Sequence, residues 1–216
     1  VEQIVCLFMG DLVEGGEMRG NQKWGLEFTL AQQVSKGTST LLDFLTSLEE
    51  IAPVTFGAVK GNHDRLTGQA NKKDQIYNDH AMYIVLDTLI NMQDAGFLPN
   101  TTIIDNREDM SDVELTVYGR VIHGNHGEGM KITESQVKRF VRTGPVNYLI
   151  TGHVHHSKIM QDDRDHLHII VGSPMGYNDY SKSLNLAYTD PSQTLMILPE
   201  QGDPKIKTVF LAEGGD

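Results

Sequence analysis

The chain has 216 residues, enough to bury a sizeable core, and its 39% hydrophobic and 22% charged residues are ordinary for a globular protein in water. The longest apolar run, Ile4 to Met9, is far too short to cross a bilayer, so we expect no membrane partner. The formal net charge of -11 opposes broad non-specific binding to nucleic acids, although the charge around a site can differ from that of the whole chain.

The first half of the chain predicts strands that alternate with amphipathic helices. The predicted strands are short apolar runs, and the predicted helices carry apolar residues at three- and four-residue spacing. In chain order we expect a strand at 4–9, a helix at 30–48, a strand at 54–59 and a helix at 82–90.

The second half predicts mostly strands. They are expected at 101–105, 115–122, 147–150, 166–171, 194–198 and 205–211. A capping box at Thr133-Glu134-Ser135-Gln136 predicts one helix among them, with Val137, Phe140 and Val141 on its buried face. Alternating strands and helices followed by strands indicate an α/β fold.

We expect one domain over residues 1–216, because no repeat, low-complexity tract or shift in composition marks a linker. The single cysteine, Cys6, excludes an intramolecular disulfide and fits a reducing compartment, so the expected location is cytoplasmic. The sequence does not decide the oligomeric state, and a homodimer is one option.

Four short polar segments each follow a predicted strand. They are Gly10-Asp11, Gly61-Asn62-His63-Asp64, His123-Gly124 and Gly152-His153-Val154-His155. Side chains placed just beyond strand ends can converge from different loops on one cleft. Asp, Asn and His together suit a borderline metal such as Mn²⁺, Fe or Zn²⁺, and two such ions suit the hydrolysis of phosphate esters.

The segment at 61–64 is the strongest of the four signals. Asn62 offers a neutral oxygen ligand, and His63 can donate a proton to a leaving alkoxide. Asp64 can orient His63, as carboxylates behind a functional histidine do. The alternative is a polar turn between a strand and a loop. The next residue, Arg65, can bind a phosphate oxygen, with a surface arginine as the alternative.

The later segments add four histidines. His123 ends a predicted strand and is a candidate metal ligand, whereas His126 lies in a glycine-rich loop and suits contact with phosphate or water. His153 and His155 point to the same side if their segment is extended. A lone histidine at a strand end is more often structural. The prediction of a metal site therefore depends on all four segments occurring together.

In this order the segments resemble the calcineurin-like metallophosphoesterase superfamily over residues 4–174, and most of all phage and bacterial SbcD-type DNA repair exonucleases. The resemblance implies a sandwich of two mixed β-sheets flanked by helices. It also implies two divalent ions, with Mn²⁺ expected and Fe or Zn²⁺ as alternatives. The general acid it implies is His63, supported by Asp64, and the implied metal ligands are Asp11, Asn62, His123, His153 and His155.

One element of the family pattern is missing. The pattern opens with Asp-x-His, and nothing before Asp11 supplies it. One ion would keep Asp11, Asn62, His123 and His153, while the other would keep only Asp11 and His155. We therefore expect the chain to be truncated at its N-terminus and to lack the first strand of the fold.

The function that the resemblance implies is a metal-dependent phosphoesterase that hydrolyses phosphodiester bonds with a metal-activated hydroxide. A DNA exonuclease is the expected activity, with DNA as substrate. The alternatives are a phosphatase or phosphodiesterase of small nucleotides and a metal-binding scaffold without catalysis. The intact His63 and Asp64 favour catalysis, and the missing Asp-x-His favours the scaffold.

Overall fold

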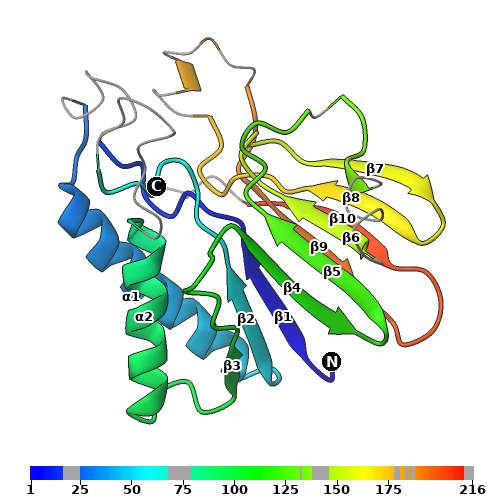
Figure 1. Ribbon diagram of the computed structural model, residues 1–216, viewed down its shortest axis with the longest axis horizontal. Coiled ribbons are helices and arrows are strands. Elements are labelled where there is room, and N and C mark those ends of the chain that lie inside the picture. The colour runs from blue at the N-terminus through cyan, green and yellow to red at the C-terminus, as the bar shows by residue number, and fades with distance from the viewer. Residues whose placement is uncertain are drawn as a thin grey trace. The chain divides into compact units, whose positions relative to one another are not determined.

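The computed structural model describes residues 1–16, 25–67, 79–131, 133–137, 146–177, 181–182, 185 and 188–211. The chain divides into two compact units, Val1–Val113 and Glu114–Asp216, whose strands and helices are labelled in Figure 1. Within the described ranges, no helix combines the length and the hydropathy that crossing a membrane requires.

Unit 1 is built on a parallel three-stranded sheet in the order β1-β2-β3. These strands are β1 (Ile4–Phe8), β2 (Val54–Ala58) and β3 (Thr101–Ile103), and the helices that pack against them are α1 (Leu30–Glu49) and α2 (Ala81–Asp94). Figure 1 shows the two helices beside the sheet. The two strands and two helices expected in the first half are therefore confirmed within a few residues at their ends.

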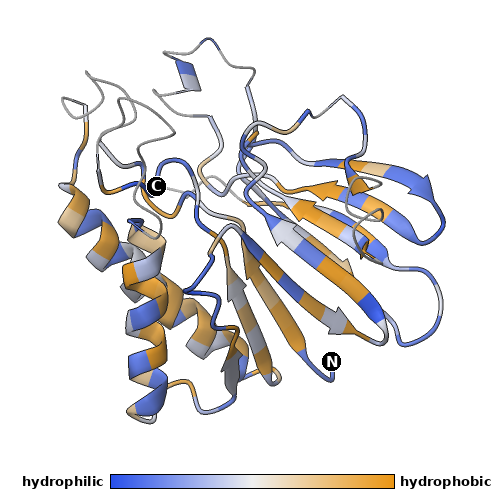
Figure 2. Ribbon diagram, viewed as in Figure 1, coloured by the Kyte–Doolittle hydropathy of each residue, from blue (hydrophilic) through white to orange (hydrophobic). Residues whose placement is uncertain are grey.

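The core of unit 1 lies where the apolar faces of both helices meet the sheet. Leu45 from α1, Phe56 from β2 and Met82 and Leu86 from α2 are fully buried there. Figure 2 shows polar residues on the other parts of both helices, as expected of amphipathic elements. Burying each large apolar side chain stabilises the fold by about 1.5–3 kcal/mol, so this core holds the sheet edge that carries the site.

The start of α1 is set by a capping box. The side-chain oxygen of Thr29 accepts a hydrogen bond of 3.4 Å from the backbone N–H of Gln32, and the Gln32 side chain accepts one of 2.9 Å from the backbone N–H of Thr29. Such a box satisfies N–H groups that the first helical turn leaves open. The box therefore stabilises the start of α1 at Leu30.

The remaining strands form a five-stranded mixed sheet and a two-stranded antiparallel sheet, in the orders β4-β5-β6-β8-β7 and β10-β9. The strands are β4 (Asp112–Val117), β5 (Arg120–Asn125), β6 (Val146–Thr151), β7 (Lys158–Asp163), β8 (His166–Ile170), β9 (Ser192–Ile197) and β10 (Lys205–Phe210). Strands β5, β6 and β8 are parallel, and β7 runs antiparallel to β8. The predicted α/β class with mixed sheets and helices is confirmed.

The prediction of one strand over 115–122 is wrong, because β4 and β5 are two strands of a hairpin. Tyr118 and Gly119 lie between them, both with positive φ, at 49° and 75°. Two such residues form the tight turn whose twist matches that of the paired strands. The helix predicted after the capping box at 133–136 lies largely outside the described residues, including Phe140 and Val141.

Candidate active site

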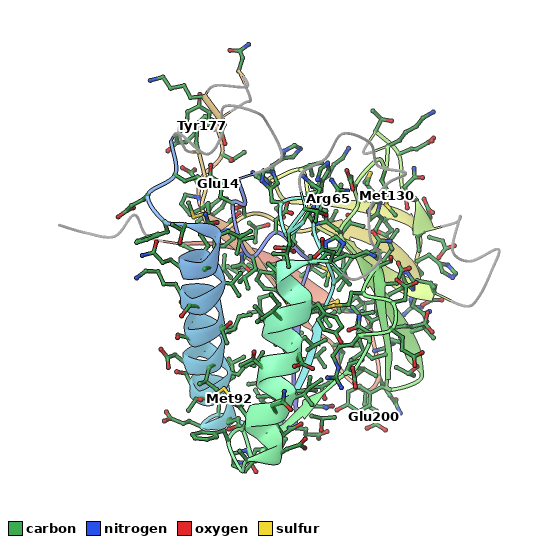
Figure 3. All side chains as sticks on the ribbon, turned by 60° about the vertical axis from the view of Figure 1, so that its left-hand side comes forward. Glu14, Arg65, Met92, Met130, Tyr177 and Glu200 are labelled. Carbon is green, nitrogen blue, oxygen red and sulfur yellow. The ribbon has the colours of Figure 1, made fainter. Side chains whose placement is uncertain are left out.

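The loops after β1 and β2 in unit 1 carry Asp11 and the segment 61–65. Because β1 and β2 are parallel neighbours, their carboxyl ends meet at one edge of the sheet. Figure 3 shows Glu14 and Arg65 at one end of the two helices and Met92 near the other end. The predicted site residues of unit 1 are therefore brought together at a single edge.

The Asp64 carboxylate joins the two loops. Asp64 is fully buried, and its oxygens accept hydrogen bonds from four backbone N–H groups. Oδ2 accepts from Gly61 at 2.7 Å and Asp11 at 3.0 Å, and Oδ1 accepts from Leu12 at 2.9 Å and Val13 at 3.4 Å. Hydrogen bonds to a charged acceptor are stronger than neutral ones. This carboxylate thus has a structural role that the sequence did not predict.

Asp11 lies directly against the second loop. Its Oδ1 accepts a 2.8 Å hydrogen bond from the backbone N–H of His63, and its own backbone has a φ of 57°. A Cβ atom added to Gly61 would lie 2.1 Å from Asp11 Oδ1, so only glycine permits this approach. A left-handed conformation at a non-glycine residue stores strain, which is typical of functional positions.

The ring of His63 is held by a backbone group. Nδ1 lies 2.8 Å from the carbonyl oxygen of Glu14, and the residue is only 9% exposed. A carbonyl can only accept, so Nδ1 carries the hydrogen, and Nε2 is the atom to which the sequence prediction of a general acid applies. The Glu14 carbonyl thus orients the His63 ring, a contact that the sequence does not predict.

Two cations flank the same segment. Arg65 is 7% exposed, and it pairs with His80 through an antiparallel bridge at the start of α2. Burial lowers the pKa of Lys60, the nearby Arg65 charge lowers it further, and Asp109 and Asp112 act in the opposite direction. Lys60 and Arg65 therefore flank the segment that contains the buried Asn62, with the carboxylates of Asp109 and Asp112 acting on Lys60.

The predicted site histidines of unit 2 lie in or after two parallel neighbours, β5 and β6. His123 lies in β5, His126 follows it, and His153 and His155 follow β6. The Nε2 atom of His126 is 3.2 Å from Nδ1 of His153, and the rings meet edge to face. The sequence predicts contact of His126 with phosphate or water, and its position beside His153 also suits a shared metal ion.

The segment after β6 is not extended, which corrects the geometric expectation for its two histidines. His153 and His155 have φ values of 70° and 62°, in the left-handed region. The same-side placement expected from strand alternation therefore does not apply. Each such residue costs about 1–3 kcal/mol, and this strain persists only where the surroundings enforce it.

Glu114 is a residue of the site that the sequence reading missed. Its Oε2 lies 3.2 Å from Nδ1 of His123, across the β4–β5 hairpin. A carboxylate on one ring nitrogen orients the ring and leaves the other nitrogen for a metal. The Tyr118-Gly119 turn could have revealed the hairpin, and with it the pairing of Glu114 and His123.

A buried histidine supports the end of β6. His168 in β8 is fully buried, and its Nδ1 accepts from the backbone N–H of Gln136 at 3.2 Å. Its Nε2 must then carry the hydrogen and donate to Thr151 Oγ1 at 3.0 Å. Burial lowers the pKa of this ring to about 4, with Lys158 also lowering it and Asp162 opposing. The neutral ring therefore fixes Thr151, two residues before His153.

This chain belongs to the calcineurin-like phosphoesterase superfamily, whose domain matches residues 36–192, more than half of the sequence. The superfamily resemblance is thereby confirmed. Its members are phosphoesterases that usually bind divalent metal ions. No curated protein matches the sequence significantly.

Several solved structures are similar to this chain. A mutant of Vps29 from Entamoeba histolytica is 14% identical, with coverage of 97% of this chain and 99% of that chain and a TM-score of 0.45. A predicted phosphoesterase from Streptococcus pneumoniae is 11% identical, with coverage of 96% and 88% and a TM-score of 0.44. Wild-type Vps29 from Entamoeba histolytica, complexed with zinc, is 15% identical, with coverage of 72% and 81% and a TM-score of 0.38.

The residues of each unit fit the divalent metals that the superfamily implies. Unit 1 offers the carboxylate of Asp11 and the amide of Asn62, and unit 2 offers converging imidazole nitrogens from His126 and His153. The side-chain oxygen of Asn125 is buried and has no hydrogen-bond partner within the part of the chain that the structure describes. Such donors suit borderline ions.

Proposed function

We propose that this protein hydrolyses phosphodiester bonds in a metal-dependent reaction and that DNA is its substrate. The observation that supports this most directly is the anchoring of His63 through Nδ1 to the Glu14 carbonyl. In this proposal Nε2 carries the proton to the leaving oxygen. The leaving group of a phosphodiester in DNA is a basic alkoxide, which needs that proton, whereas a metal-binding scaffold has no use for a general acid.

The metal ligands in this proposal are Asp11 and Asn62 of unit 1 and His123, His153 and His155 of unit 2, with His126 as a further candidate beside His153. We expect two divalent ions, with Mn²⁺ as the working choice. When bound, such ions supply Lewis-acid stabilisation of the charge that develops on the phosphoryl oxygens. The protein's own contributions are to orient His123 through Glu114, to hold Asp11 and Asn62 on joined loops, and to keep the His63 ring in one tautomer.

The choice of DNA rests on local charge and on the nuclease resemblance. Arg65 and Lys60 flank the segment that contains Asn62, and in this proposal they contact the phosphate backbone. Lys72 and Lys73, a further expected contact, lie outside the described residues. The net charge of -11 predicts modest affinity that falls steeply with added salt. Because the cations are local, single strands and exposed ends should be preferred over intact duplex.

The test uses the 216-residue chain supplemented with Mn²⁺. It compares end-labelled single-stranded DNA, duplex DNA, and small cyclic and dinucleotide esters at low salt. We expect cleavage of the single strand and its loss on adding a chelator. Turnover of the small esters without cleavage of DNA would show that the substrate is a small nucleotide and not DNA. Binding of metal with no turnover of any ester would refute the catalytic proposal.

The Asp11→Ala variant separates the metal-dependent reaction from a contaminating nuclease. This variant should lose metal binding and activity together, because the carboxylate is the charged ligand of unit 1. The matched control is Asp43→Ala, which removes an exposed carboxylate from α1. Activity that survives Asp11→Ala unchanged would assign the observed cleavage to another protein.

A further inference from the structure

The side-chain amide of Gln33, in the first turn of α1, binds the loop that follows β1. Its Oε1 accepts a 3.1 Å hydrogen bond from the backbone N–H of Gly15. Its Nε2 donates to the Gly15 carbonyl at 3.4 Å and to the Phe28 carbonyl at 2.9 Å. The amide therefore engages both backbone groups of one loop residue and ties that residue to the chain just before the helix.

The residue bound in this way is next to the group that orients His63. The Glu14 carbonyl, immediately before Gly15, accepts from the His63 ring at 2.8 Å. Gly15 also lies against the His63 backbone, because a Cβ atom added to Gly15 would lie 2.5 Å from the His63 carbonyl oxygen. A shift of this loop by a few tenths of an ångström would therefore change the hydrogen bond to the ring.

The loop is held at two points, with the Glu14 carbonyl between them. On one side, the N–H groups of Leu12 and Val13 bind the buried Asp64 carboxylate. On the other side, Gly15 binds Gln33. Gln33 lies in the first turn of α1, directly after the capping box of Thr29 and Gln32. The Glu14 carbonyl therefore lies between two anchored points of the loop, one bound by the Asp64 carboxylate and the other by the Gln33 side chain.

We propose that Gln33 is a positioning residue for His63 and that it acts by fixing the Glu14 carbonyl, which holds the His63 ring in the Nδ1–H tautomer. This inference rests on the proposed general-acid role of His63 for its effect on catalysis. Its effect on the tautomer does not depend on any activity. Gln33 itself touches neither the ring nor any reacting atom in this assignment.

The first experiment measures the tautomer in metal-free protein. Nitrogen-15 NMR of the histidine rings, recorded about two pH units above the ordinary histidine pKa, reports which nitrogen carries the hydrogen. Wild type should show His63 almost entirely protonated on Nδ1. Gln33→Ala should show a mixture with the Nε2–H form, and Gln33→Glu, which keeps the acceptor for the Gly15 N–H, should lie between the two. An unchanged tautomer in Gln33→Ala would overturn the proposal.

The second experiment measures turnover on two leaving groups with Mn²⁺ present. Gln33→Ala should lose about tenfold more activity on an alkyl phosphodiester than on a p-nitrophenyl ester, since only the former needs the proton. The matched control is Gln32→Ala, which removes the same side chain from the same turn and breaks the capping box. It should leave the ratio of the two activities unchanged even if it lowers the melting temperature.

The outcomes distinguish the two proposals. If wild type hydrolyses neither ester, the proposed function fails, and the NMR result still decides the role of Gln33. If His63→Ala changes the ratio of activities and Gln33→Ala does not, the positioning role is refuted while the general acid stands. An equal change of the ratio in Gln32→Ala and Gln33→Ala would assign the effect to the helix start, and the positioning role would again be refuted.

Discussion

The Asp64 carboxylate accepts a 3.0 Å hydrogen bond from the backbone N–H of Asp11, a residue 53 positions earlier in the chain. The same carboxylate binds the N–H groups of Leu12, Val13 and Gly61. The buried carboxylate thus accepts the hydrogen bonds of four backbone N–H groups and holds the two site loops of unit 1 together. Position 64 is therefore as much a part of the fold as of the site.

Replacing Asp64 by Ala should lower the free energy of unfolding by about 3 kcal/mol or more, because it leaves four backbone donors without their acceptor. Urea unfolding followed by circular dichroism measures the change. The control, Asp43→Ala, removes an exposed carboxylate and should shift stability by no more than about 0.5 kcal/mol. Similar stabilities for the two variants would contradict the role of Asp64 as a joint between loops.

Replacing His63 by Ala should reduce turnover of an alkyl phosphodiester by about 10²–10⁴-fold, the usual contribution of a general acid. The loss should be smaller for p-nitrophenyl esters, whose leaving group hardly needs a proton. Metal binding, measured by calorimetry, should stay close to wild type because His63 is not a ligand in this assignment. Equal losses on both leaving groups would argue against the general acid.

Replacing His153 by Ala should weaken Mn²⁺ binding at least about tenfold. Removing a residue that only hydrogen-bonds to a metal ligand usually costs about 10–100-fold in affinity, and removing the ligand itself should cost no less. Isothermal titration calorimetry with Mn²⁺ gives the affinity and the number of ions bound. His156→Ala is the matched control, since His156 lies in the same segment and is exposed. A normal titration for His153→Ala would remove this residue from the metal site.

Replacing Glu114 by Gln should weaken metal binding by about tenfold. This is the low end of the usual range for a carboxylate that hydrogen-bonds to a histidine ligand, and we choose it because the Glu114 side chain is 60% exposed. In metal-free protein, nitrogen-15 NMR should show the His123 ring losing its preference for hydrogen on Nδ1. Glu134→Gln, at another exposed position of unit 2, serves as the control. If neither measurement changes, the contact between Glu114 and His123 has no functional weight.

The buried, neutral ring of His168 should make unit 2 less stable in mild acid. Burial lowers its pKa from 6.5 to about 4, so between these values the unfolded state binds a proton that the folded state does not. The free energy of unfolding should therefore fall as pH drops from 6.5 to 4, by about 2 kcal/mol from this group. Urea unfolding across this range should show a weaker pH dependence for His168→Gln than for wild type. His156→Gln, an exposed control, should follow wild type, and an identical slope in His168→Gln would contradict the prediction.

The sequence determined the types of residue at the site and their order along the chain. Short apolar runs ending in Asp11 and in Asn62-His63-Asp64 predicted strands with polar residues at their ends, and β1 and β2 confirm those strands. These features are local, since strand and helix periods and the chemistry of a ligand can be read within a few residues. The superfamily resemblance followed from the same segments.

Only the tertiary structure decided which groups hold those residues. The partner of the His63 ring is a backbone carbonyl 49 residues away, at Glu14, and no side-chain pattern marks a carbonyl. The partner of His123 is Glu114, brought opposite by a hairpin that reads as one strand when its apolar residues are counted alone. Strand pairing and loop contacts bring such partners together, and those depend on the packing of the whole unit rather than on any one segment.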